Sequence, residues 1–200
     1  MNVLTVVTHP RIESLTFSMA DHLIKGIKDN GHHTDMLDLY RLGFNPVLGI
    51  EDEPEWTAKS QIFSAEVHEE MQRLEQYDAL AFVFPLWWWS MPALMKGYID
   101  RVWNYHFAYG ARQLPHKQVL WLSLAGAPVE RFEKRQYDAM IRHYFNVGLA
   151  DYCGIPISKF ELFYETVKPT PQHVQKWQTR SYELGNTFFT HVETTGVVSK

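Results

Sequence analysis

A group of hydroxyl-bearing residues near the N-terminus has the chemistry of a phosphate site. Ser14, Thr16 and Ser18 open an amphipathic helix, and His9 and Pro10 stand between them and a short apolar run. The first turn of a helix has free N–H groups and the positive end of the helix dipole, which together favour an anion. Two interpretations stay open, a phosphate loop or hydroxyls that only cap the helix. The glycine-rich loops G-x-G-x-x-G and G-x-x-x-x-G-K-[ST] are absent.

Three consecutive tryptophans, Trp87 to Trp89, could form the wall of a site for a planar ligand. Neighbouring side chains alternate between faces in a strand and fan out by roughly 200° in a helix, so the three cannot all enter one core. At least one should line a groove or a subunit contact, and tryptophan is frequent in both. We favour the ligand wall because the segment directly follows an apolar run of strand type.

The elements that must position these residues alternate between short buried strands and amphipathic helices. Strands are predicted at 3–7, 33–39, 79–84, 119–124 and 157–162, and helices at 16–30, 64–76, 92–103, 130–152 and 170–189. Residues 40–60 contain prolines, glycines and an acidic run, which predict a long surface loop. Five such units predict an α/β three-layer sandwich with a five-stranded parallel sheet in the order 2-1-3-4-5 and helices on both faces. One domain is expected over residues 1–200.

A sheet of this order binds ligands at the carboxyl ends of its strands, near the switch between strands 1 and 3. The hydroxyl-bearing loop follows strand 1, and the tryptophans follow strand 3. The segment after strand 4 reads Leu124-Ala125-Gly126-Ala127, whose backbone N–H groups can face a ligand. The three segments together predict one ligand site at this edge.

The composition excludes several classes of protein. A net charge of −4 argues against a nucleic-acid or anionic-membrane surface. No stretch approaches the ~20 apolar residues of a membrane span, and the N-terminus lacks the basic region of a signal peptide. The single cysteine, Cys153, excludes an intrachain disulfide, and we expect an inert core thiol and a cytoplasmic location. His68 has no second histidine at the spacing of a zinc hydrolase, and no metal site is expected.

The segment FPLWWWSMPALMKGYIDRVW resembles the flavin-contacting segment of the flavodoxin-like NAD(P)H dehydrogenases of the quinone type. The residues that fit the family pattern are Pro85, Trp88, Pro92, Ala93, Lys96, Gly97, Tyr98, Asp100, Arg101 and Val102. The loop THPRIESLTFS is similar to the family's phosphate-binding loop, and FAYG at 107–110 and YCGI at 152–155 resemble further family motifs. The likeness covers roughly residues 1–165. Within the family it is greatest to a bacterial branch that includes ancillary oxidoreductases of potassium-efflux systems.

This resemblance implies a flavodoxin-like fold, a bound flavin, NAD(P)H as co-substrate and a homodimer with the pocket at the subunit boundary. FMN is favoured over FAD because no extra segment is set aside for an adenosine. Cofactor contacts are expected at His9, Ser14, Leu15, Thr16, Phe17, Pro85, Leu86, Trp87, Trp88, Trp89, Leu124, Ala125, Gly126 and Ala127. Tyr105, His106 and Tyr109 are catalytic candidates for the acceptor pocket, with simple packing as the alternative. Lys96 and Arg101 are expected to anchor helix ends or a subunit contact.

The chain departs from the family after strand 4. The family usually has T-T-G-G there, and some members relay a proton through a tyrosine and a histidine just beyond, whereas residues 128–138 contain Phe132 and Tyr137 but no histidine. Two functions stay open. One is an NAD(P)H-dependent flavin oxidoreductase that reduces quinones by ping-pong hydride transfer, and the other is a flavin-bound ancillary subunit that docks on a membrane transporter. The modest net charge and the tryptophans disfavour an electron-carrier flavodoxin.

Overall fold

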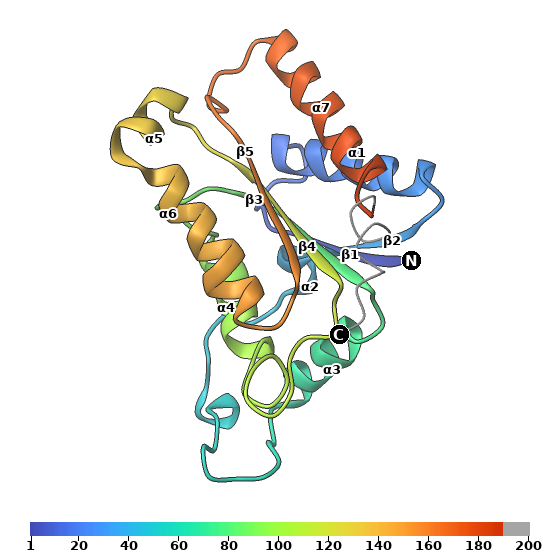
Figure 1. Cartoon of the computed structure of the whole chain (residues 1–200), viewed down its shortest axis with the longest axis vertical. Coiled ribbons are helices and arrows are strands. Elements are labelled where there is room, and N and C mark those ends of the chain that lie inside the picture. The colour runs from blue at the N-terminus through green and yellow to red at the C-terminus, as the bar shows by residue number, and fades with distance from the viewer. Residues whose placement is uncertain (190–200) are drawn as a thin grey trace, which may run out of the picture.

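The computed structural model describes residues 1–189, and its centre is a five-stranded parallel sheet in the order β2-β1-β3-β4-β5 (Figure 1). The strands are β1 (Asn2–Val7), β2 (His33–Asp38), β3 (Ala79–Pro85), β4 (Gln118–Leu124) and β5 (Ile157–Phe163). Every residue of β3 and β4 is buried, because these strands are flanked by neighbours and covered on both faces. The predicted fold class and strand order are confirmed.

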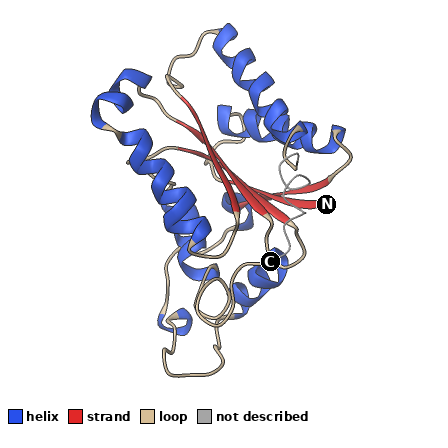
Figure 2. Cartoon of the chain, viewed as in Figure 1, coloured by secondary structure: helices blue, strands red, loops and turns tan. Residues whose placement is uncertain are grey.

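Helices cover both faces of the sheet (Figures 1 and 2). On one face, α1 (Leu15–Asp29) and α7 (Pro171–Asn186) pack against each other and against the odd-numbered residues of β1 and β3. On the other, α3 (Ala65–Leu74), α4 (Ala93–Val102) and α6 (Tyr137–His143) cover the even-numbered ones. The period-2 alternation of side chains thus divides the apolar residues into two cores.

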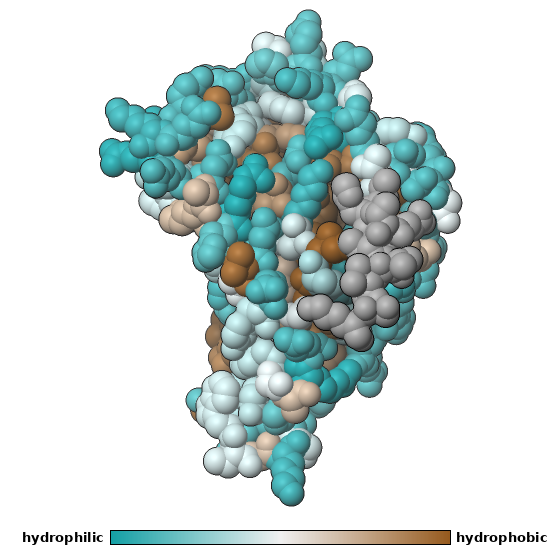
Figure 3. All heavy atoms as spheres, viewed as in Figure 1, coloured by the Kyte–Doolittle hydropathy of each residue, from teal (hydrophilic) through white to brown (hydrophobic). Residues whose placement is uncertain are grey.

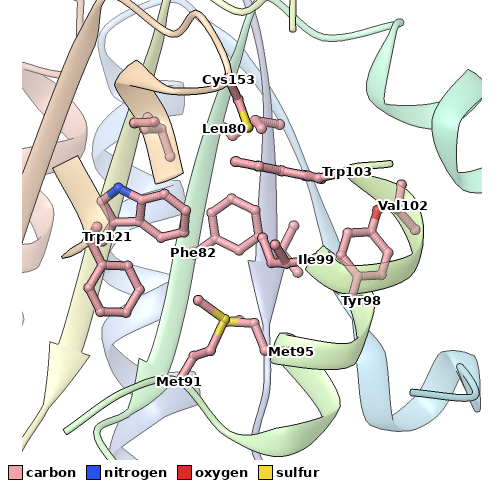
Figure 4. Packing of buried hydrophobic residues seen from close by; sticks show 14 of the residues in the cluster. Leu80, Phe82, Met91, Met95, Tyr98, Ile99, Val102, Trp103, Trp121 and Cys153 are labelled. Atoms are coloured by element: carbon pink, nitrogen blue, oxygen red, sulfur yellow. The ribbon is translucent and has the colours of Figure 1, made fainter. Parts of the chain in front are cut away.

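The core beneath α4 is aromatic. Phe82 of β3 stacks on Trp121 of β4 with ring centroids 4.7 Å apart, and Trp103 meets Phe82 edge-on at 5.9 Å (Figure 4). Offset stacking and edge-to-face contacts are the preferred geometries of aromatic pairs. This packing fixes the two central strands, and therefore the loops that leave their carboxyl ends.

Two glycines allow α1 and α7 to approach closely. A Cβ at Gly26 would collide with the carbonyl oxygen of Tyr182, and one at Gly185 would collide with the carbonyl oxygen of Leu23. Because the clashes are with backbone, no side-chain rearrangement relieves them. The contact therefore requires glycine on both helices.

The predicted loop at 40–60 is wrong in part, because it contains two short helices and a buried ion pair. The Asp38 carboxylate accepts hydrogen bonds from the N–H groups of Tyr40 and Arg41 and caps α2 (Leu39–Leu42). Further on, a 3₁₀ turn, Ile50–Asp52, ends at a carboxylate that is wholly buried. Its partner is Arg101 of α4, at 2.6 Å, so the segment is tied to the core.

The predicted helix at 130–152 is also wrong as a single element. It divides into α5 (Val129–Arg135), α6 and a π-helical stretch, Tyr144–Asp151, with Gln136 between α5 and α6 in the left-handed region (φ 57°, ψ 28°). A left-handed residue turns the chain out of the helix axis, and glutamine gives no sequence signal for it. The last helix ends at Asn186, and the end of the predicted domain, residues 190–200, lies outside the described residues.

No helix within residues 1–189 is both long enough and apolar enough to cross a membrane.

Candidate active site

The loop after β1 starts α1 with a capped first turn. Ser14 is the N-cap residue, and its Oγ accepts a hydrogen bond from Phe17 N–H at 3.3 Å, so this hydroxyl caps the helix. The N–H groups of Leu15 and Thr16 have no helical partner, because the first turn of any helix lacks one. These two amides are therefore available to bind an anion. The side chains of Thr16 and Phe17 are buried.

Arg41, which the sequence did not indicate, fixes this loop from the side. Its guanidinium donates to the carbonyl oxygens of His9 at 2.8 Å and Pro10 at 2.6 Å, and it pairs with Asp38 at 3.4 Å. The His9 ring lies against the loop's own backbone, with Nδ1 3.1 Å from Arg11 N. Arg41 is about thirty residues from the loop, and a contact of that kind leaves no local pattern.

The tryptophan loop is a tight turn. The backbone N–H of Trp87 donates to Ser90 O at 2.9 Å, and that of Ser90 donates to Trp87 O at 3.1 Å. The two central residues, Trp88 and Trp89, both have positive φ, as a type I′ turn requires. Their side chains separate as predicted, since Trp88 is 93% exposed while Trp89 turns back onto Tyr137, with ring centroids 3.8 Å apart.

The tryptophan loop and the loop after β4 form one cavity of about 180 Å³, lined by Leu86, Trp88, Trp89, Ala125, Gly126, Ala127 and Phe132. Strand register brings them together, because Pro85 pairs with Leu124 and Leu86 N–H donates to Leu124 O at 2.8 Å. Phe132, from α5, closes the wall by meeting Trp89 edge-on at 5.4 Å. Two of the three predicted segments therefore share a cavity at the carboxyl edge of the sheet.

Comparison with known proteins agrees with this architecture. A family model described as a flavodoxin-like fold matches residues 1–183. The uncharacterised NAD(P)H oxidoreductase YcaK of Escherichia coli strain K12 is 42% identical over 151 residues, which cover 75% of this chain and 76% of YcaK. An uncharacterised NAD(P)H oxidoreductase of Haemophilus influenzae is 32% identical over 170 residues, 82% of this chain and 83% of its own length. The chain belongs to the flavodoxin-like NAD(P)H oxidoreductase family.

A solved structure of this flavodoxin-like family also superposes closely. The NAD(P)H:quinone oxidoreductase from Methanothermobacter marburgensis has a TM-score of 0.88 at 28% sequence identity, over 94% of this chain and 96% of that one. The similarity extends over the whole sheet and its helices, so the loops at the carboxyl edge occupy the position at which flavodoxin-like sheets bind ligands.

The three acceptor-pocket candidates lie at the amino edge of the sheet, opposite the cavity of Trp89. Tyr105, His106 and Tyr109 follow α4, which returns from the carboxyl edge to the amino edge of the sheet. Tyr105 stacks on His106 at 3.9 Å and lies 5.6 Å from Tyr109, and the first two line a separate cavity of about 360 Å³ beside α3. The structure groups the three residues, but it does not bring them to Trp89 of the same chain.

Lys96, Arg101 and Cys153 have structural surroundings. Lys96 pairs with Asp100 one turn along α4. Arg101 is buried in its ion pair with Asp52, which places it inside one chain and not at a subunit contact. Cys153 is 4% exposed, and burial raises the pKa of its thiol to about 11, so it is protonated at neutral pH.

The residues at the carboxyl edge fit a flavin. An aromatic wall and the backbone of residues 125–127 line one cavity, and the first turn of α1 leaves two amides without a helical partner, as a ring with a phosphate tail needs. The Thr8 hydroxyl, at the end of β1, is buried and has no hydrogen-bond partner within residues 1–189. A buried hydroxyl without a partner is unfavourable unless a ligand or water satisfies it. The threonine hydroxyls of the family's T-T-G-G have no counterpart at Leu124 and Ala125.

Proposed function

We propose that this chain is an NAD(P)H-dependent flavin oxidoreductase that reduces quinones or similar small electron acceptors. The observation that carries the proposal is the cavity in which Trp89 meets Gly126, at the ligand-binding edge of a flavodoxin-like sheet. The names of the bacterial relatives support the use of NAD(P)H, and the M. marburgensis structure supports a quinone as acceptor.

The chain's own groups would bind and orient the cofactor. The amides of Leu15 and Thr16 would hold its phosphate, with His9 beside them, and the Pro85–Trp89 segment would lie along its ring. Once bound, flavin supplies the electron-transfer chemistry. The N–H groups of Gly126 and Ala127 would stabilise negative charge at the ring edge, as fixed backbone dipoles do in other enzymes. FMN is proposed over FAD because the five βα units leave no segment set aside for an adenosine.

Tyr105, His106 and Tyr109 can act as an acceptor pocket only across a subunit boundary, because they lie at the opposite edge from Trp89. We therefore propose a homodimer in which the second copy supplies them. Trp88, at 93% exposure, is the kind of side chain that a dimer would cover. NAD(P)H and acceptor would use the same face of the cavity in turn, which gives ping-pong kinetics.

The test is an absorbance spectrum of the purified protein after incubation with FMN or FAD and desalting. We expect the protein to retain absorbance bands at ~450 nm. These bands should bleach when NADPH or NADH is added without oxygen, and they should return when a soluble quinone is added next. Chromatography of the heat-released flavin then identifies FMN or FAD. A protein that retains neither flavin, or whose flavin does not bleach with either nucleotide, contradicts the proposal.

The comparisons do not support the alternative, an ancillary subunit that docks on a membrane transporter. The relatives are named as oxidoreductases, and the cavity is built to take small molecules.

A further inference from the structure

We propose that Arg131, Lys134 and Arg135 of α5 bind the phosphate groups of the nicotinamide dinucleotide. The inference rests on the proposed function and names the site that recognises its co-substrate. The three cations line a cavity of about 510 Å³ together with Trp89, Tyr137 and Glu130. Figure 3 shows hydrophilic side chains gathered over α5, at the upper left of the molecule.

Trp89 joins this cationic cavity to the proposed flavin cavity. The same indole lines both, with Gly126 and Ala127 on one side and the α5 cations on the other. It is held in place by Tyr137, stacked at 3.8 Å, and by Phe132, edge-on at 5.4 Å. A ligand that lies over the flavin ring and extends past this indole would meet the cations next.

The three cations are free to bind a ligand. Within residues 1–189 none of them takes part in an ion pair, although Glu130 and Glu133 stand on the same short helix. The chain as a whole has a net charge of −4, which repels an anionic nucleotide. A local group of unpaired cations beside the cavity counteracts that repulsion where the nucleotide must enter.

The backbone break at Gln136 gives α5 its separate orientation. Gln136 is in the left-handed region at φ 57°, so α5 does not continue along the axis of α6 (Figure 1). A non-glycine residue in that conformation is unfavourable and is retained where the surrounding structure requires it. Here the break leaves the cations beside Trp89, whereas a continuous helix would extend them along one axis with α6.

The chemistry of the cluster selects the nucleotide over the acceptor. An arginine guanidinium binds phosphate oxygens through two parallel hydrogen bonds, and these charge-assisted bonds are the stronger kind. NADH has a pyrophosphate, NADPH has a 2′-phosphate as well, and a quinone has neither. The cluster should therefore affect the nucleotide half of the reaction and leave the quinone half unchanged.

The experiment compares Arg131→Gln and Arg135→Gln with Lys28→Gln, which removes the same charge from the exposed last turn of α1 at the opposite edge of the sheet. Titration calorimetry of the flavin-loaded proteins with NADP⁺ and NAD⁺ measures binding without turnover. Each arginine variant is expected to raise the Kd for nucleotide roughly tenfold, and the control is expected to leave it unchanged. A rise for NADP⁺ alone identifies the 2′-phosphate as the ligand, and a rise for both identifies the pyrophosphate.

Three results contradict the inference while the proposed function stands. One is an unchanged Kd for both nucleotides in both arginine variants, in a wild-type protein whose flavin bleaches with NADPH. Another is a loss of flavin retention in the variants, which would assign the cations to the cofactor. A KM for quinone that rises with the KM for nucleotide also contradicts the proposed selectivity. If the wild-type flavin does not bleach at all, the proposed function fails and the inference fails with it.

Discussion

Replacing Asp52 by asparagine should destabilise the protein by about 3 kcal/mol, the lower end of the range for breaking a buried ion pair. The carboxylate is wholly buried and accepts four hydrogen bonds, two from Arg101 at 2.6 and 2.9 Å and two from Ser64 at 2.8 and 3.1 Å. Asparagine would direct an NH₂ group at these donors and leave the guanidinium under-compensated. The half-exposed carboxylate of Glu66 also pairs with Arg101, which limits the loss.

The assay is thermal and urea unfolding followed by circular dichroism. For a chain of 200 residues, 3 kcal/mol corresponds to a fall in Tm of about 6–12 °C. Glu66→Gln is the matched control, since it neutralises the exposed partner of the same guanidinium and should cost at most about 1 kcal/mol. An Asp52→Asn variant no less stable than Glu66→Gln would refute the reasoning.

The pH dependence provides a second check on the same pair. Burial alone would raise the pKa of Asp52, but the hydrogen bonds from Ser64 and Arg101 outweigh it and hold the pKa below its usual value. A carboxylate with a lowered pKa stabilises the fold above its unfolded pKa, about 3.9, and loses that contribution as pH falls through the folded value. The difference between wild type and Asp52→Asn should therefore be full at pH 7 and shrink below about pH 4. A difference that persists unchanged in acid would exclude ionisation as its source.

Three further experiments test the site and the core. Trp89→Ala should weaken flavin binding by about tenfold or more, because it removes the wall shared by two cavities. Fluorescence titration measures the change, and unchanged flavin binding would contradict the role of this indole. Cys153 should react with a thiol reagent at pH 7 only as fast as the protein opens, because its thiol is buried and its pKa is raised to about 11. Prompt labelling of the folded protein would contradict both properties. Gly26→Ala should lower the free energy of unfolding in urea by about 1–3 kcal/mol, because its Cβ would collide with the backbone of α7. The control Gly148→Ala places its Cβ at ordinary contact distances and should not lower it. Equal effects of the two variants would contradict the close helix contact.

The sequence predicts the sheet well because its central strands are continuous apolar runs. ALAFVF and VLWLSL are short runs rich in β-branched and aromatic residues, which favours strands buried on both faces, and both strands are found within one residue of the predicted limits. The order 2-1-3-4-5, expected for a chain this short with five βα units, is found, and it places the loops after β3 and β4 side by side.

The parts that the sequence does not predict depend on long-range contacts or on backbone conformations without a residue signature. Asp52 and Arg101 are 49 residues apart, so neither indicates that the other is buried. Gln136 ends a helix in a conformation for which glycine is the usual signal. Tyr105 and His106 are predicted as acceptor-pocket residues from their position between the helix and strand 4, but in a parallel sheet a segment that precedes a strand lies at the amino edge, opposite the cavity of Trp89.

The glycine contact between α1 and α7 has a consequence for the order in which the protein is completed during synthesis. Helix α1 begins at the proposed phosphate loop, but its apolar partner α7 lies about 140 residues further along the chain, since α1 ends at Asp29 and α7 begins at Pro171. Until residues 171–186 leave the ribosome, the face of α1 around Gly26 stays exposed to water. The nascent chain must therefore hold this apolar face uncovered while residues 30–170 are made.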